Sequence, residues 1–156
     1  MSTAVKPIPV PRFPVWVVVA DGAKARILVG KTGRGAFEKE EVQINPEARK
    51  HGRDLVTDAP GRVFDSAGQG RHGMEPPTDP KDAVEESFAR ELAERLHQGA
   101  LEDAYEKLYV IATPVFLGYL RKHYTDAIRQ RLAGEIDKDL TAQDAEAIRA
   151  ALPEIL

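Results

Sequence analysis

The chain of 156 residues contains no cysteine, which excludes disulfide bonds and thiolate metal ligands. It has no apolar run of transmembrane length, and its N-terminus lacks the apolar core of a secretory signal. Charge of one sign is not in large excess either. The formal net charge of −3 argues against a protein dominated by contacts with nucleic-acid phosphates, though not against a local basic patch. These absences predict a cytoplasmic protein with no membrane partner.

What is present is ordinary for a globular domain. Hydrophobic residues make up 42% of the chain and charged residues 30%, and the length suits one domain with a single core. The prolines within residues 1–14 predict an extended arm. We expect residues 15–156 to form one domain with a long loop at 46–79.

The first part of the domain predicts three antiparallel strands. Residues 15–20 (VWVVVA) form a continuous, mostly β-branched run that is typical of a strand buried on both faces. The turn Asp21-Gly22-Ala23 leads into a second strand at 24–29, and a glycine-containing turn follows. Residues 37–45 alternate only in part between apolar and polar side chains, which indicates an edge strand with one face in water.

The next part predicts a long helix followed by a buried strand. Pro80 favours the start of a helix, and its apolar stripe recurs every four residues: Val84, Phe88, Leu92 and Leu96. We expect this helix to end at Gly99, because glycine is a common helix stop. Residues 107–112 (KLYVIA) are nearly all apolar and predict a second central strand.

The end of the chain predicts two further helices and one further strand. Thr113 and Pro114 combine a capping residue with a proline in the first turn, and so predict a helix that reaches about Tyr124. Residues 132–137 alternate as a half-exposed strand does. A final helix is expected to about Leu152, with Thr141 as its cap and Asp144 as a capping-box partner.

The predicted fold class is therefore α/β, in the order β-β-β-α-β-α-β-α. An antiparallel meander joined to a parallel βαβ unit gives a mixed five-stranded sheet with three helices packed on it. This element order is that of ribonuclease-H-like folds.

The loop carries the main candidate site. Its central stretch, residues 61–80 (GRVFDSAGQGRHGMEPPTDP), has no helical or strand period, and long loops inside compact domains are often functional. Flexible backbone, an amide, a guanidinium and an imidazole stand together there and can contact a phosphate or orient a water. The candidate binding residues are Arg62, Ser66, Gly68, Gln69, Gly70, Arg71 and His72. Two alternatives remain: a plain surface loop, or arginines such as Arg53 and Arg62 that pair with the loop's own acids.

A secondary candidate site lies where two central strands end. Asp21 follows the first strand and Thr113 follows the second, and ligands favour the carboxyl ends of strands in mixed α/β sheets. Amides at the start of the following helix can bind an anion. The competing interpretation, which we favour, is that Asp21 only shapes the hairpin turn.

No metal site or cofactor is expected. The histidines are scattered, with no pair at the i, i+4 spacing of a helical zinc site: His51, His72, His97 and His123. A two-metal nuclease needs several carboxylates around its ions. Asp21 could be one, but no further acid falls at an obvious inward position.

Three segments of the chain resemble one family, the bacterial host-attachment proteins, which are described as required for attachment to host cells. They are ADGAKARIL at 20–28, DAPGRVFDSAGQGRHGMEP at 58–76, and FARELA at 88–93 followed by IATPVFLGYLR at 111–121. The family is in turn similar to the middle domain of archaeo-eukaryotic peptide-chain release factors, where a Gly-Gly-Gln loop helps hydrolyse peptidyl-tRNA. Residues 67–70 would be the equivalent here, with Ala67 in place of the first glycine.

The resemblance implies a non-catalytic binding module that contacts the ribosome or RNA through residues 58–76. An alternative is a small ester hydrolase of the peptidyl-tRNA type, with Gln69 as its catalytic residue positioning a water. A third alternative is a scaffold that binds a protein partner through the exposed edge of the strand at 37–45.

Overall fold

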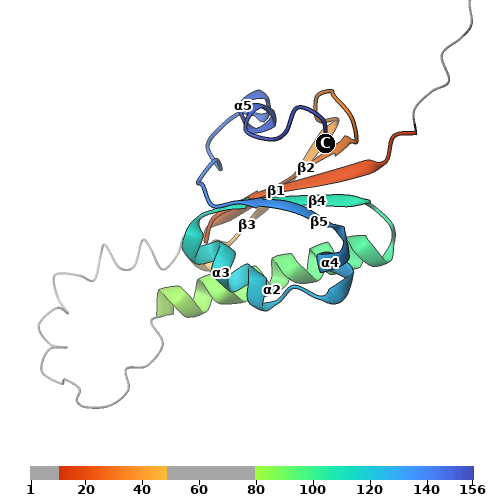
Figure 1. Ribbon diagram of the computed structural model, residues 1–156. Helices are drawn as coiled ribbons and strands as arrows, with labels where there is room; N and C mark the ends of the chain where they lie inside the picture. The colour runs from red at the N-terminus through yellow and green to blue at the C-terminus, as the bar shows by residue number, and fades with distance from the viewer. Residues whose placement is uncertain (1–10, 49–79) are drawn as a thin grey trace, which may run out of the picture.

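The computed structural model describes residues 11–48 and 80–156 (Figure 1). Within these ranges the sheet and its helices follow the predicted order, with two helical segments added, residues 46–48 and α4. The elements are β1 Pro14–Ala20, β2 Lys24–Lys31, β3 Lys39–Ile44, α2 Pro80–Leu101, β4 Lys107–Ala112, α3 Pro114–Lys122, α4 Asp126–Arg131, β5 Leu132–Ile136 and α5 Ala145–Ala150. No helix among the described residues is both long and apolar enough to cross a lipid bilayer.

The strands form one mixed five-stranded sheet in the order β3-β2-β1-β4-β5. β1, β2 and β3 are an antiparallel meander, whereas β4 lies parallel to β1, and β5 parallel to β4. The register places Ala20 beside Ala112, so β1 and β4 end at the same edge of the sheet. The predicted mixed sheet is confirmed, and the strand expected at 37–45 is indeed at the sheet's edge.

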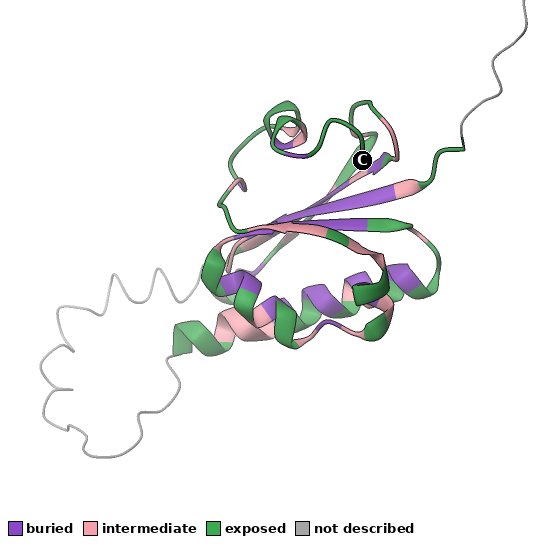
Figure 2. Ribbon diagram, viewed as in Figure 1, coloured by how far each residue is buried: buried purple, intermediate pink, exposed green. Residues whose placement is uncertain are grey.

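Helices cover both faces of the sheet (Figure 1). α2, α3 and α4 lie on one face, where Trp16, Val18 and Ile27 meet the apolar side of α2. α5 and the chain after it lie on the other face, against Val17, Leu28 and neighbouring residues. β1 is consequently buried along nearly its whole length (Figure 2).

The long helix α2 does not end at Gly99, as its sequence predicts, but continues to Leu101. Gly99 is a contact point instead: a Cβ there would lie 2.7 Å from the Trp16 ring and 3.1 Å from the Tyr105 ring. Those two rings pack with their centroids 4.7 Å apart. Burial raises the pKa of Tyr105 to about 12, and its hydroxyl donates to the carbonyl of Leu96 at 2.6 Å. Glycine is used here because it lets the helix approach the sheet closely.

Two other helix predictions need correction. The expected three helices are too few, since α4 follows α3 directly and the side chain of Thr125 accepts from the amide of Ile128 at its start. The last helix is capped by Asp144, not by Thr141: Asp144 accepts from the amide of Ala147 at 2.8 Å. Residues 46–48, expected to begin the loop, are helical.

The two faces of the edge strand β3 differ: Lys39, Glu41 and Gln43 share the face covered by α2, and Glu40, Val42 and Ile44 share the other. Glu41 faces α2 and pairs with Arg95 at 2.9 Å. Val42 and Ile44, on the other face, are 49% and 46% exposed. The alternation in this strand is therefore real, but its apolar face does not belong to the core.

Two glycines in helices provide a matched test of this packing. Gly99→Ala should destabilise the protein, because overpacking costs about 1–3 kcal/mol and the gain in helix propensity offsets only about 1 kcal/mol of it. Gly118→Ala in α3, where an added Cβ meets nothing within 4 Å, should instead stabilise by up to about 1 kcal/mol. Urea unfolding of both variants measures the difference. Equal effects would contradict a packing role for Gly99.

Candidate functional site

The main candidates of the loop lie outside the described residues. They are Arg62, Ser66, Gly68, Gln69, Gly70, Arg71 and His72, so their roles stay predictions. The structure does describe the residues on either side of this segment. Residues 46–48 follow β3, and α2 begins at Pro80.

The secondary candidates, Asp21 and Thr113, are neighbours in the fold. Each follows directly after its strand, and the amide of Thr113 donates to the carbonyl of Ala20 at 3.3 Å. Both residues are half-buried at the sheet edge formed by the carboxyl ends of β1 and β4. The side chain of Thr113 makes no capping hydrogen bond to α3. The fold thus brings these two residues together, as their positions after the strands predict.

The carboxylate of Asp21 is engaged within its own turn. Its Oδ1 accepts from the amides of Ala23 and Lys24 at 2.8 and 2.9 Å, while Oδ2 lies 3.3 Å from the hydroxyl of Thr141. The same hydroxyl is closer to Asp139, at 2.7 Å. Since one hydroxyl carries one hydrogen, it cannot donate to both carboxylates at once. Asp21 therefore holds the hairpin turn and faces the chain that leads into α5.

Asn45 was not among the residues predicted from the sequence. It is only 5% exposed, and its side-chain amide donates to the carbonyls of Gly22 at 3.0 Å and Val84 at 3.5 Å. Its backbone amide donates to the carbonyl of Ala23. Asn45 thus ties the end of β3 to both the β1–β2 turn and the start of α2. The described elements on either side of residues 49–79, the end of β3 and the start of α2, therefore meet at this edge of the sheet.

A buried arginine holds residues 141–143 in place beside the sheet. Arg26 of β2 is 8% exposed and forms two hydrogen bonds with the carboxylate of Glu40, at 2.6 and 3.1 Å. Its other contacts are the carbonyls of Thr141 and Gln143. The hydrogen bond from Arg26 holds the pKa of Glu40 below its ordinary value of 4.5, against the effect of burial. This network fixes the position of the chain that brings Thr141 to Asp21.

The fold also brings together two histidines that the sequence separates. His97 of α2 and His123, after α3, line one cleft of about 430 Å³. His97 Nδ1 lies 2.8 Å from the hydroxyl of Thr125, and His123 Nε2 lies 3.7 Å from Glu86. Across residues 11–48 and 80–156, no group of three or more His, Asp or Glu side chains is placed to hold a metal ion.

Comparison with known proteins identifies the family. The family described as "Protein required for attachment to host cells" matches residues 16–152, which is nearly all of the domain. The chain belongs to this family. The match extends from β1 to the end of α5, so it includes the turn at Asp21, the segment 49–79 and the strand end at Thr113. The family assignment agrees with the resemblance of the sequence motifs.

Two further similarities are more distant. An uncharacterized protein of Rickettsia prowazekii, RP470, is 31% identical over 81 residues, covering 51% of this chain and 54% of that protein. The chain thus spans about half the length of this curated relative. Crystal structures of the Aquifex aeolicus Ppx/GppA enzyme are 10–13% identical and align with a TM-score of 0.38. They cover 79–81% of this chain and 35–36% of the enzyme.

A pair of substitutions tests the role of Asp21 in its turn. Asp21→Ala removes the acceptor for two backbone amides and should destabilise the protein by about 1–2 kcal/mol. Asp21→Asn keeps an acceptor oxygen in place and should cost less than half as much. The measurement is urea unfolding at pH 7. An equal loss in both variants would mean that the negative charge, and not the turn, is what the fold requires.

The Arg26–Glu40 pair predicts a pH dependence. Because the pKa of Glu40 is lowered in the folded state, its contribution to stability is present above pH 4.5 and is lost as the pH falls through the folded pKa. Glu40→Gln should therefore cost about 1–2 kcal/mol at pH 7 and progressively less in acid. Urea unfolding between pH 3 and 7 measures this trend. Glu91→Gln, at an exposed position of α2, is the control, and a cost of Glu40→Gln that does not vary with pH would contradict the prediction.

Proposed function

We propose that this member of the host-attachment family is a non-catalytic module that binds RNA or the ribosome through residues 58–76. The observation that carries the proposal is that the described elements on either side of residues 49–79 meet at one edge of the sheet. Asn45 joins the end of β3 to the turn after β1 and to Val84 of α2. Binding segments are commonly loops whose two flanking elements belong to a packed scaffold, and β3 and α2 meet this condition.

The sheet topology supports the comparison with release factors. An antiparallel meander, β3-β2-β1, continued by the parallel strands β4 and β5, is consistent with a ribonuclease-H-like fold. In the release-factor middle domain, the Gly-Gly-Gln loop precedes a long helix. Here residues 67–70 precede α2, which has 22 residues. The topology and this placement together favour the translation machinery as the partner.

The composition of the segment favours binding over catalysis. Ala67 stands where the release-factor loop has its first glycine, and its Cβ restricts the backbone conformations that allow close approach. The segment from 49 to 79 has five Lys or Arg residues and five Asp or Glu residues. Affinity would therefore come from a few placed contacts, such as a guanidinium on a phosphate, and not from a large net charge.

Co-sedimentation with ribosomes across a salt series tests the proposal. The wild-type protein should co-sediment at low salt and dissociate as the salt concentration rises. Arg71→Ala should bind more weakly, and the slope of log affinity against log salt should fall by about 1 if Arg71 contacts one phosphate. Gln69→Ala should bind like the wild type, and neither protein should release peptide from peptidyl-tRNA.

Arg90→Ala is the matched control. Arg90 is an exposed arginine of α2 outside the segment, and its loss should leave binding unchanged. An equal loss in both arginine variants would show non-specific attraction. Hydrolysis that depends on Gln69 would replace the proposal with the hydrolase alternative. Absence of co-sedimentation at every salt concentration would reject it and favour a protein partner at the exposed edge of β3.

A further inference from the structure

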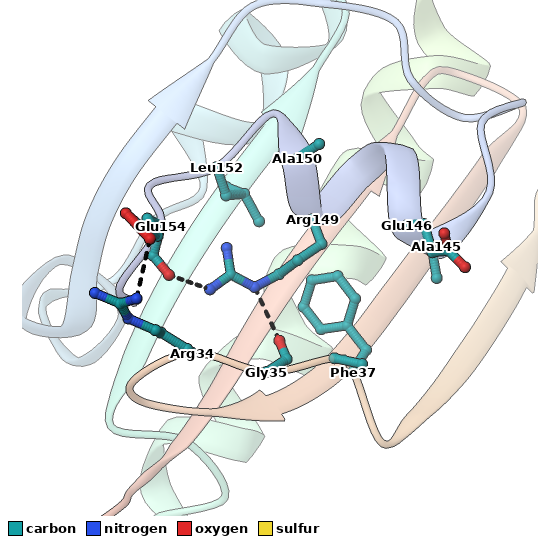
Figure 3. Close-up of a pocket in the computed structure, with 10 residues that line it drawn as sticks. Arg34, Gly35, Phe37, Ala145, Glu146, Arg149, Ala150, Leu152 and Glu154 are labelled. Carbon is teal, nitrogen blue, oxygen red and sulfur yellow. Dashed lines mark hydrogen bonds and ion pairs between the residues drawn. The ribbon is translucent and has the colours of Figure 1, made fainter.

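A second cleft lies far from the edge that holds Asp21. It has a volume of about 580 Å³ and lies between the β2–β3 loop and α5 (Figure 3). Its apolar lining includes Phe37, Ala150 and Leu152, and charged residues stand around them (Figure 3). The volume lies within the range of small-molecule sites, which is roughly 300–1,000 Å³. It is formed at the opposite end of β2 from the Asp21 turn, so it is independent of the proposed RNA-binding edge.

The walls of this cleft are fixed by hydrogen bonds. The guanidinium of Arg149 donates to four backbone carbonyls, those of Gly33, Gly35, Pro153 and Glu154. Gly33 and Leu156 also exchange two backbone hydrogen bonds, each 3.0 Å long. These contacts join the β2–β3 loop to the chain after α5. The cleft is thus already formed, which reduces the cost of ordering it around a ligand.

Some charged side chains of the cleft have partners within the protein, and one does not. At one end Arg34 pairs with Glu154 at 3.1 Å, and Arg149 is held by the carbonyls. Glu146, beside Ala145 in Figure 3, is exposed and has no hydrogen bond or ion pair with any residue in the described ranges. A ligand that brings a positively charged donor to this end meets a free carboxylate, whereas a ligand carboxylate finds the nearest guanidinium groups already engaged.

We propose that this cleft binds a primary amine with an apolar or aromatic body. The body packs against Phe37 and Leu152, where it removes apolar surface from water. The ammonium group lies beside Glu146 at the open end of the cleft, where it stays partly hydrated. A cation at this end can also approach the face of the Phe37 ring. The apolar contacts supply most of the affinity, and Glu146 supplies the preference for an amine.

The test uses three probes of similar size that differ in charge: 2-phenylethylamine, 2-phenylethanol and phenylacetate. Each is titrated into the full chain, and the amide and side-chain signals of Phe37, Glu146 and Ala150 are followed by NMR. The amine should bind about two- to fivefold more tightly than the alcohol, the range expected for an exposed ion pair. Phenylacetate should bind more weakly than either.

Two variants separate the contributions. Ala150→Leu places a larger side chain in the cleft at an exposed position, and should abolish binding of the amine and the alcohol alike. Glu146→Gln should reduce the affinity for the amine to that of the alcohol, while Glu91→Gln on α2 should change nothing. Signals that shift elsewhere but not at the cleft would overturn the proposal. So would equal affinity for all three probes, which would show an adventitious apolar surface only.

Discussion

The central strand β1 has no side facing water, and the rest of the structure depends on this constraint. From Val15 to Ala20 no residue is more than 5% exposed. Neighbouring strands satisfy its backbone on both sides, β2 antiparallel and β4 parallel. Each face of the sheet must then be covered, and the chain has to place a helical layer on both. The positions of Asp21, at the end of β1, and of the cleft beneath α5 follow from how these two layers are attached.

The two layers are attached by different means. On the α2 side, apolar contact dominates: Phe88, Leu92 and Leu96 are buried against the sheet, and Gly99 brings the helix close to Trp16. On the other side α5 has only six residues, too few to bury a large apolar stripe. Arginine–carbonyl hydrogen bonds complete its attachment, from Arg26 on β2 to residues 141 and 143, and from Arg149 on α5 to the β2–β3 loop. An open cleft between α5 and that loop is a consequence of this sparser packing.

The contrast between the layers also explains which features the sequence predicts. β1, β4 and the stripe of α2 are encoded by local periodicity, because burial on both faces or along one helical face leaves a direct pattern. α4 and the start of α5 leave weaker patterns, since six-residue helices span less than two turns. Asp144 and Thr141 are both acceptable caps by residue type. Only the structure shows that the hydroxyl of Thr141 lies 2.7 Å from Asp139 and 3.3 Å from Asp21, and so is used elsewhere.

Long-range contacts such as those of Asn45 and Arg26 leave no pattern in the sequence. These contacts nevertheless define the secondary candidate site at Asp21 and Thr113. Asn45 is one polar residue after a strand, and nothing nearby in the sequence indicates that its amide reaches Val84. Yet this contact holds the end of β3 and the start of α2, the described elements on either side of residues 49–79, beside the turn that Asp21 holds. At this carboxyl edge of the sheet, the carboxylate of Asp21 already accepts from two backbone amides of its own turn. Under the proposed function, recognition comes from residues 58–76 and not from this carboxylate, which is why Arg71 and Gln69 are better tests of that function than Asp21.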